Sequence, residues 1–386
     1  MKNNGKILLT ATISAIVASI ATGTIFIATN TYNQNTNEED FSDYYEVINY
    51  IDQYYYKEPD KESYMDNALK GLVAGLGDPY AIYMTPDEYQ SQMESYEGSF
   101  AGIGVTITQN EDKEFEIVEV LKDSPALENG IEVGDIITSV NDIKTDHLTN
   151  QELVTLVKGP VGTQVTITFK RDGKEFDKTL TRDEIKSETV EYQMLENNTA
   201  YIKVTSFKDV TTDQFKIALD SALNDGAEKI IYDLRNNGGG LLTSCQAMLD
   251  LLLPEGDVAY AKFKDGSETV ICSSDKKELN LPTVILVNEN TASASELFSS
   301  AMRDFDKAQL VGTKTYGKGI MQNTIGLSNN GGLTITVAEY RTAKSECFHG
   351  EGLQPDYEVE LPEGTDISSP DPEKDPQLKK AMEILK

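Results

Sequence analysis

Two short segments near the C-terminus contain residues that could supply a nucleophile and its base. One holds Ser293 and Ser295, and the other holds Lys318 between two glycines. A serine hydroxyl attacks a carbonyl carbon once a neighbouring base accepts its proton, and a neutral lysine amine is able to be that base. The only histidines, His147 and His349, lie outside both segments. The sequence therefore predicts that any hydrolytic chemistry here works without histidine.

The serines are expected where a helix begins after a buried strand. Thr283–Val287 has the pattern of the strand, and the helix is expected from Ser293 onward. A helix N-terminus carries partial positive charge and unpaired amides, so the Ala294 N–H could help to hold an oxyanion. The same residues also fit a capping box in which Ser293 and Glu296 only cap the helix. The spacing leaves Ser295 open as a second candidate nucleophile.

Lys318 can act as a base only in its neutral form. Its amine has an ordinary pKa of about 10.4, which must fall by about 3, and burial is a common cause of such a fall. The flanking glycines would let the backbone pack closely enough to bury the amine. Gln322 lies on a predicted strand at 320–327, where its amide could orient the lysine. A solvated turn lysine, or a role for Lys314 instead, stays open.

A third segment, residues 233–240, reads Asp-Leu-Arg-Asn-Asn-Gly-Gly-Gly between a predicted strand and a predicted helix. Consecutive glycines there expose backbone amides, which suit a phosphate or an oxyanion. The spacing does not match the dinucleotide-binding pattern, and no Gly-Lys-Ser/Thr follows, so nucleotide binding is disfavoured. A tight structural turn remains an alternative.

The N-terminal residues predict attachment to a membrane. Lys2 and Lys6 precede an uncharged run at 7–29, which exceeds the roughly 20 residues needed to span a bilayer. No clean cleavage site follows it, so an uncleaved single-pass anchor is favoured over a cleaved and secreted form. The positive-inside rule then places the rest of the chain outside the cytoplasm.

Composition excludes several other classes of protein. The net charge is −30, from 34 Lys and Arg against 64 Asp and Glu, and no basic stripe is present, so a nucleic-acid partner is not expected. The three cysteines, Cys245, Cys272 and Cys347, are scattered along the chain. They indicate neither a disulfide framework nor a metal site, and no cofactor is expected.

Hydrophobic patterning divides the chain into five parts: an anchor at 1–30, a stalk and helical segment at 31–96, a β-rich module at 97–184, an α/β domain at 185–361, and an acidic tail at 362–386 that ends in a short helix. Helices are expected near 41–56 and 64–76, with a connector at 91–97. In the α/β domain, four buried strands near 200–204, 229–234, 283–287 and 309–311 alternate with helices, which predicts a largely parallel sheet.

The β-rich module resembles a PDZ domain. Its segment at Gly102, Ile103, Gly104 and Val105 is similar to the loop whose amides receive a peptide's C-terminal carboxylate, with the next strand pairing with the peptide. Residues 124–137 continue the PDZ pattern, which argues against a generic glycine-containing hairpin.

From about residue 41 to residue 360 the chain resembles the bacterial carboxyl-terminal processing proteases, also called tail-specific proteases. The motifs that carry the resemblance are residues 77–80 (Gly-Asp-Pro-Tyr), the PDZ stretches, and residues 233–240, 293–296, 317–322 and 352–356. Asn237 stands where many members have proline, and Leu76-Gly77 where many have Leu-Asp. Neither departure touches the chemistry.

This resemblance implies a serine endopeptidase that recognises the C-terminal tail of exported proteins through its PDZ domain and cleaves through an acyl-enzyme. It implies the following site: Ser293 as nucleophile, Lys318 as base, Gln322 as its support, and an oxyanion hole from Ala294 with Gly238 and Gly239. It thereby selects Ser293 over Ser295 and Lys318 over Lys314.

The implied fold is α/β, a crotonase/Clp-protease-like core with an inserted PDZ domain and a helical N-terminal segment. The implied partners are protein or peptide substrates with apolar C-termini, and a homodimer is left open.

The main alternative to a protease is a catalytically inactive PDZ-bearing scaffold or adaptor. A histidine-dependent PDZ protease is disfavoured because its Gly-Asn-Ser-Gly-Gly nucleophile motif does not occur, and a crotonase-like acyl-CoA enzyme would not explain the PDZ module.

Overall fold

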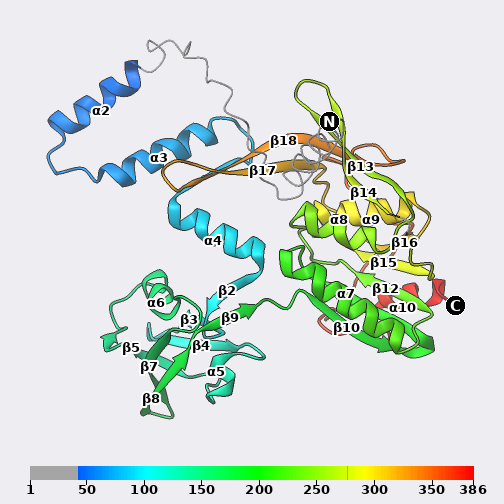
Figure 1. Ribbon diagram of the computed structural model, residues 1–386, viewed down its shortest axis with the longest axis horizontal. Helices are drawn as coiled ribbons and strands as arrows, with labels where there is room; N and C mark the ends of the chain where they lie inside the picture. The colour runs from blue at the N-terminus through cyan, green and yellow to red at the C-terminus, as the bar shows by residue number, and fades with distance from the viewer. Residues whose placement is uncertain (1–41, 276) are drawn as a thin grey trace, which may run out of the picture. The chain divides into compact units, whose positions relative to one another are not determined.

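The computed structural model describes residues 42–275 and 277–386, so the predicted anchor at 1–30 lies outside the described residues. The chain forms two compact units (Figure 1). The larger combines residues up to Met93 with Thr189–Lys386, and the smaller is Glu94–Glu188, which encloses the predicted PDZ boundaries of 97–184. Within the described ranges, no helix is both long enough and apolar enough to cross a membrane.

A six-stranded sheet forms the centre of the larger unit, in the order β10-β11-β12-β15-β16-β19. Only the β10–β11 pair is antiparallel, as the alternating pattern of strands and helices predicts. The strands are β10 Val190–Leu195, β11 Thr199–Val204, β12 Lys229–Asp233, β15 Thr283–Val287, β16 Ala308–Gly312 and β19 Tyr357–Glu358. All five residues of β15 are buried, because parallel sheets are covered on both faces.

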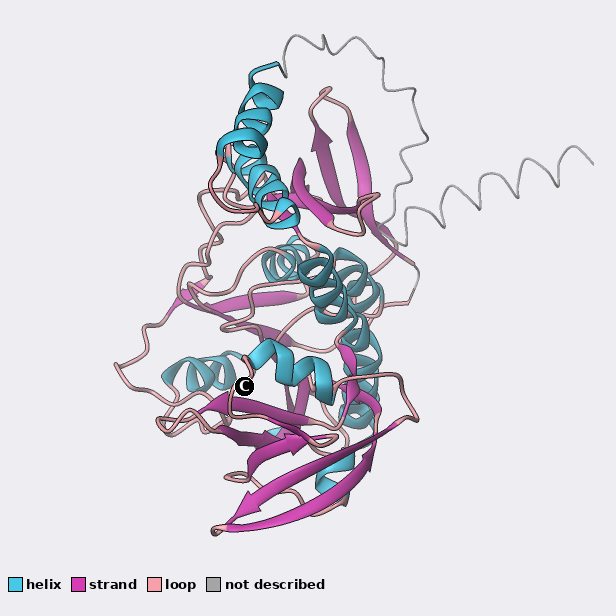
Figure 2. Ribbon diagram, turned by 90° about the vertical axis from the view of Figure 1, so that its left-hand side faces the viewer, coloured by secondary structure: helices cyan, strands magenta, loops and turns pink. Residues whose placement is uncertain are grey.

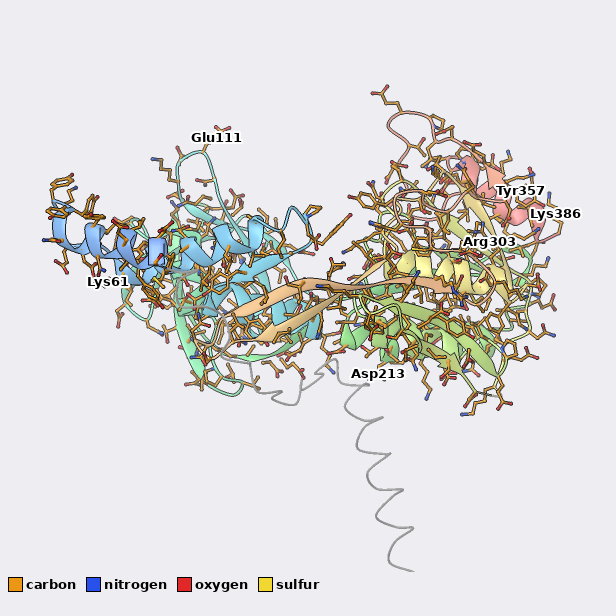
Figure 3. The ribbon with its side chains drawn as sticks, turned by 90° about the horizontal axis from the view of Figure 1, so that it is seen from above. Lys61, Glu111, Asp213, Arg303, Tyr357 and Lys386 are labelled. Carbon is orange, nitrogen blue, oxygen red and sulfur yellow. The ribbon has the colours of Figure 1, made fainter. Side chains whose placement is uncertain are left out.

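Helices cover both faces of this sheet (Figure 2). Three of them, α7 Asp209–Asn224, α8 Leu242–Asp250 and α9 Ala294–Asp304, share one apolar core with the sheet. The C-terminal helix α10, Pro376–Ile384, buries Leu378 and Ala381 in a separate core on the sheet. Tyr357 of β19 packs against this second core, and it lies near the C-terminal Lys386 in Figure 3.

A second, five-stranded antiparallel sheet belongs to the same unit. Its strands are β1 Ile82–Met84, β13 Gly256–Phe263, β14 Glu268–Ser274, β17 Ile320–Gly326 and β18 Gly332–Thr342. Of these, the sequence predicted β17 alone. Half-exposed strands alternate buried with more exposed positions, as β18 does over most of its length. They give a weaker apolar signal than buried parallel strands do.

The N-terminal helices are α2 Ser42–Tyr54, α3 Lys61–Ala74 and α4 Pro86–Glu97. The first two confirm the predicted helices. The predicted connector at 91–97 is wrong, because these residues are the second half of α4. The missed signal was local: Thr85 N–H donates to Glu88 Oε2 at 2.8 Å, and Pro86 occupies the first helical position.

The smaller unit is a β-rich module with two short helices. Its sheet has the order β3-β4-β5-β7-β8 with β6 attached to β5, and β2 pairs with β9. The elements are β2 Ser99–Gly102, β3 Val105–Gln109, β4 Phe115–Val120, α5 Pro125–Glu128, β5 Ile136–Val140, β6 Ile143–Lys144, α6 Asn150–Val157, β7 Gln164–Arg171, β8 Lys174–Thr181 and β9 Asp183–Lys186. The predicted helix at 150–157 is confirmed, and a Thr149–Glu152 capping box starts it.

Candidate active site

Ser293 stands at the mouth of α9 in an unusual backbone conformation. Its φ is 58° and its ψ is −117°, which is costly for a residue with a side chain. The surrounding structure must therefore hold it there. The Ser293 N–H donates to Glu296 Oε2 at 2.9 Å, so Glu296 caps this end of the helix while Ser293 remains half-buried at its mouth.

The other candidates from the sequence are placed less favourably for chemistry. Ser295 is fully buried, and its hydroxyl donates to the Asn237 carbonyl at 2.9 Å. That bond gives Ser295 a structural role, since it joins α9 to the glycine-rich loop. Lys314 is exposed to solvent.

Glu296 connects the serine segment to the lysine segment. Its carboxylate is completely buried. Oε1 accepts from Thr315 Oγ1 at 2.6 Å and from the Gly317 N–H at 2.7 Å. Oε2 accepts from the Lys318 N–H at 2.8 Å, in addition to the bond from Ser293. One carboxylate therefore holds the backbones of Ser293 and Lys318 next to each other.

Tyr340 of β18 makes a second connection between these two residues. Its hydroxyl donates to the Lys318 carbonyl at 2.8 Å and is also in hydrogen-bond contact with the Ser293 side chain. Burial raises the pKa of Tyr340 well above its usual range, so the phenol stays neutral. It can position both groups without adding a charge.

The Lys318 side chain is half-buried, and burial lowers the pKa of its amine, while the Asp78 carboxylate acts in the opposite direction. Nζ lies 4.5 Å from the centre of the Tyr80 ring. Among the described residues, no hydrogen bond joins Nζ to Ser293 or to Gln322. The structure thus brings the serine and lysine segments together but leaves the amine on Tyr80.

Gln322 lies on β17 opposite Thr336 of β18. Its Nε2 is 3.3 Å from Thr336 Oγ1 and 3.4 Å from the Ile320 carbonyl. Thr336 in turn hydrogen-bonds to Asp78 through its side chain and its backbone. Gln322 is therefore linked to Asp78 through Thr336, and its support of Lys318 stays a prediction.

The glycine-rich loop lies directly against the start of α9. A Cβ added to Gly239 would come within 2.7 Å of the Ala292 carbonyl and 2.8 Å of the Ala294 amide nitrogen. The Gly239 N–H donates to Asn237 Oδ1 at 2.9 Å. For the amides of Gly238 and Ala294, no acceptor is found in the described part of the chain, so both keep a free N–H group beside this contact.

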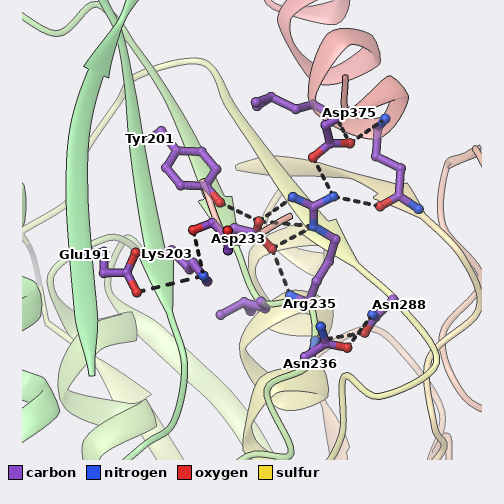
Figure 4. Close-up of polar contacts among 12 residues, drawn as sticks. Glu191, Tyr201, Lys203, Asp233, Arg235, Asn236, Asn288 and Asp375 are labelled. Carbon is purple, nitrogen blue, oxygen red and sulfur yellow. Dashed lines mark hydrogen bonds and ion pairs between the residues drawn. The ribbon is translucent and has the colours of Figure 1, made fainter. Parts of the chain in front are cut away.

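Buried polar contacts fix the base of this loop (Figure 4). Arg235 forms a pair with Asp233, with Nε to Oδ1 at 2.9 Å, and its Nη1 lies 2.7 Å from Asp375 Oδ2. The Asn236 N–H donates to Asn288 Oδ1 at 2.9 Å, which ties the loop to the segment before Ser293.

The smaller unit places all four predicted peptide-binding residues in one apolar groove. Gly102, Ile103, Gly104 and Val105 line it together with Val154, Val157 and Lys158 at the end of α6. Among the described strands, β3 pairs with β4 alone and ends the sheet order, so its other edge is able to accept a peptide strand. Gly104, at φ +79°, approaches Ser124 so closely that a Cβ would lie 2.3 Å from it.

Sequence reasoning missed several residues that the fold brings to this site. Glu296 was recognised only as a helix cap, and Tyr340 and Thr336 lie on a strand that was not predicted. Asp78 and Tyr80 belong to a motif that carried the family resemblance without a role. A local pattern could signal Glu296, but the positions of the others depend on strand pairing.

Three family models match the chain. Residues 198–359 match peptidase family S41, residues 116–171 match a PDZ domain, and residues 16–88 match the N-terminal domain of the activating protease CtpB. Together with the serine–lysine geometry, these matches define a serine-type peptidase that carries a PDZ domain.

Curated relatives cover nearly the whole sequence. The carboxy-terminal processing protease CtpA of Bacillus subtilis is 34% identical over 94% of this chain and 79% of its own length. A probable CtpA-like serine protease of Staphylococcus saprophyticus is 34% identical over 92% of this chain and 72% of its own length. The solved photosystem II D1 C-terminal processing protease is 25% identical, covers 83% of this chain and 88% of its own, and superimposes with a TM-score of 0.48. The chain belongs to the CtpA-like carboxy-terminal processing serine proteases.

Proposed function

We propose that Ser293 and Lys318 are the nucleophile and base of this protease and that it cleaves exported proteins after recognising their C-terminal tails. The observation that carries the assignment is the Glu296 carboxylate, which accepts from the backbone N–H groups of Ser293 at 2.9 Å and Lys318 at 2.8 Å. This contact keeps the two residues adjacent although they come from separate segments.

The proposed reaction proceeds through an acyl-enzyme. Neutral Lys318 accepts the proton of the Ser293 hydroxyl, and the serine oxygen attacks the substrate carbonyl carbon. The resulting oxyanion is held by the amides of Gly238 and Ala294. The peptide nitrogen leaves with the proton from Lys318. Water, activated by the same lysine, then hydrolyses the ester, and Gln322 supports the lysine through Thr336.

Substrate recognition is assigned to the groove between β3 and α6. Its amides at Gly102–Val105 would bind the terminal carboxylate, the free edge of β3 would pair with the peptide backbone, and the apolar lining favours an apolar last residue. The uncharged run at 7–29 would anchor the protein as a single span with its catalytic part outside the cytoplasm. This placement gives the protease access to exported substrates.

Cleavage of an unstructured reporter by the purified full-length chain tests the catalytic assignment. We expect Ser293→Ala and Lys318→Ala to lower the rate by at least about a thousandfold. Ser295→Ala should remain active, because the Asn237 carbonyl still accepts from the Ala292 N–H at 3.0 Å. His349→Ala should also remain active. Wild-type activity in either of the first two variants would refute the assignment.

The same assay separates catalysis from tail recognition. Replacing the apolar C-terminal residue of the reporter by aspartate should raise KM and leave the chemical step unchanged, since a charged side chain is disfavoured in an apolar groove. Equal KM values for the two reporters would refute recognition through this groove.

A further inference from the structure

The amine of Lys318 rests on a turn that supplies no reacting group to the proposed reaction. This turn, Asp78-Pro79-Tyr80, directly precedes β1, and β1 pairs with β18 so that Ile82 lies opposite Thr334. The same pairing brings Asp78 to Thr336, two positions further along β18. The Tyr80 ring thereby reaches Lys318, with its centre 4.5 Å from Nζ.

Hydrogen bonds hold Asp78 in place as a charged group. Its Oδ1 accepts from the Tyr80 N–H at 2.9 Å. Hydrogen bonding, first of all from the Thr336 side chain, lowers the pKa of Asp78 below its usual range. The carboxylate is therefore ionised at neutral pH, and its charge acts on the Lys318 amine.

The Tyr80 side chain is held as a neutral phenol. A hydrogen bond with the Tyr316 side chain, together with burial, raises the pKa of Tyr80 to about 12. Its hydroxyl is thus oriented by Tyr316, and the face of its ring contacts the Lys318 amine. A cation over the face of an aromatic ring is attracted by the ring's quadrupole, and a neutral amine is not.

We propose that Asp78 and Tyr80 are positioning residues for Lys318: they hold the protonated amine on the Tyr80 ring and release it toward Ser293 once it has lost its proton. The proposal rests on the function proposed above. Both attractions require the positive charge, so they disappear when the proton passes to solvent. The base is then free to reach the serine only in the form that can accept a proton.

The other ionisable side chains packed around Lys318 contact its backbone or Tyr80, and they therefore help to fix its position. Glu296 bonds to its N–H, Tyr340 bonds to its carbonyl, and Tyr316 bonds to Tyr80. Burial lowers the pKa of the amine, and Asp78 is the charge that opposes this effect. Removing either the Asp78 charge or the Tyr80 ring should therefore lower the pKa of Lys318 further, and the active form should appear at lower pH.

The rate at which a fluorophosphonate labels Ser293 tests the proposal without requiring tail binding. In this reaction the serine oxygen bonds to phosphorus, fluoride leaves, and the base takes the serine proton, so the rate follows deprotonation of Lys318. With the full-length chain, Asp78→Asn and Tyr80→Leu should move the acid limb of the labelling profile to lower pH by roughly half to one unit. Asparagine keeps the oxygen that accepts from Tyr80.

Two variants are matched controls. Tyr80→Phe keeps the ring and removes the hydroxyl, so its acid limb should stay at the wild-type pH. Asp87→Asn removes an exposed charge from the neighbouring α4, and its whole profile should match wild type. Thermal unfolding establishes that each variant is folded.

The proposal is overturned if the acid limb of the labelling profile does not move in Asp78→Asn and Tyr80→Leu. This includes the case in which only the plateau labelling rates of these variants fall, because such a fall indicates a structural role. It is also overturned if Tyr80→Phe shifts the limb as far as Tyr80→Leu. A different result would show that Lys318 is not the base: the Lys318→Ala variant would then be labelled with the wild-type pH profile. In that case Lys318 would not be the base, and Asp78 and Tyr80 could not position it.

Discussion

At the scale of single residues, the buried Glu296 carboxylate determines how the two chemical groups meet. Four donors converge on it, three of them backbone N–H groups. A carboxylate can satisfy all four because both of its oxygens only accept hydrogen bonds. The position therefore needs two oxygens that both accept.

Glu296→Gln tests this role. The glutamine amide group cannot accept, so one pair of donors loses its acceptor, at a cost of about 1–3 kcal/mol for each buried group. We expect a lower midpoint of chemical unfolding and a cleavage rate reduced by about a hundredfold, since small displacements of reacting groups are costly. Glu289→Gln is the control, because this exposed residue accepts a single bond from Thr313 Oγ1, which glutamine can keep. Full activity in Glu296→Gln would contradict the argument.

At the scale of elements, the site depends on two turns that meet. The turn after β12 brings the glycine-rich loop to the start of α9, and Gly239 lies at the contact with φ +98°. That value of φ favours glycine, and the neighbouring Ala292 carbonyl and Ala294 amide leave no room for a side chain. Close packing of two backbones, rather than side-chain chemistry, forms the proposed oxyanion hole.

Replacement of each glycine by alanine checks this contact. Gly239→Ala should displace the loop or the start of α9, and we expect at least a hundredfold loss of cleavage rate, because removing an oxyanion donor has an effect of about that size. Gly238→Ala should keep most of the activity, since a Cβ there would meet no described residue within 4 Å and the amide remains. Similar rates for the two variants would argue against the close contact.

At the scale of the whole larger unit, the C-terminal segment completes the catalytic core. Helix α10 covers one face of the parallel sheet with Leu378, Ala381 and Leu385. Its first residues also reach the loop below the proposed oxyanion hole, where Asp375 pairs with Arg235 at 2.7 Å. What the sequence identified as an acidic tail is therefore part of the core.

Asp375→Asn should lower the free energy of unfolding by about 1–3 kcal/mol, because the buried ion pair with Arg235 is weakened. Asparagine is as good a helix cap as aspartate, so α10 should still start at the same place, and Arg235 keeps its pair with Asp233. Denaturant unfolding measures the change. Asp371→Asn, on the partly exposed Asp371–Lys374 pair, should have an effect close to zero, and an equal loss in both variants would contradict the role of Arg235.

Features encoded by local pattern could be read from the sequence alone. The buried strand at 283–287, the helix at 150–157 and the alternation of strands and helices were predicted because apolar periodicity and helix caps are short-range signals. The PDZ module and the protease family were recognised from motifs of a few residues each. The choice of Ser293 and Lys318 also came from such motifs.

The tertiary structure decided what depends on contacts between distant segments. The connector at 91–97 became part of α4, and most of the second sheet was missed. Tyr340 and Asp78 meet Lys318, and Thr336 meets Asp78, only because β18 pairs with both β17 and β1. No local pattern encodes that register. The sequence by itself determined which groups could do the chemistry; the fold decided that Glu296 holds them together and that the Lys318 amine rests on Tyr80, because both follow from long-range packing.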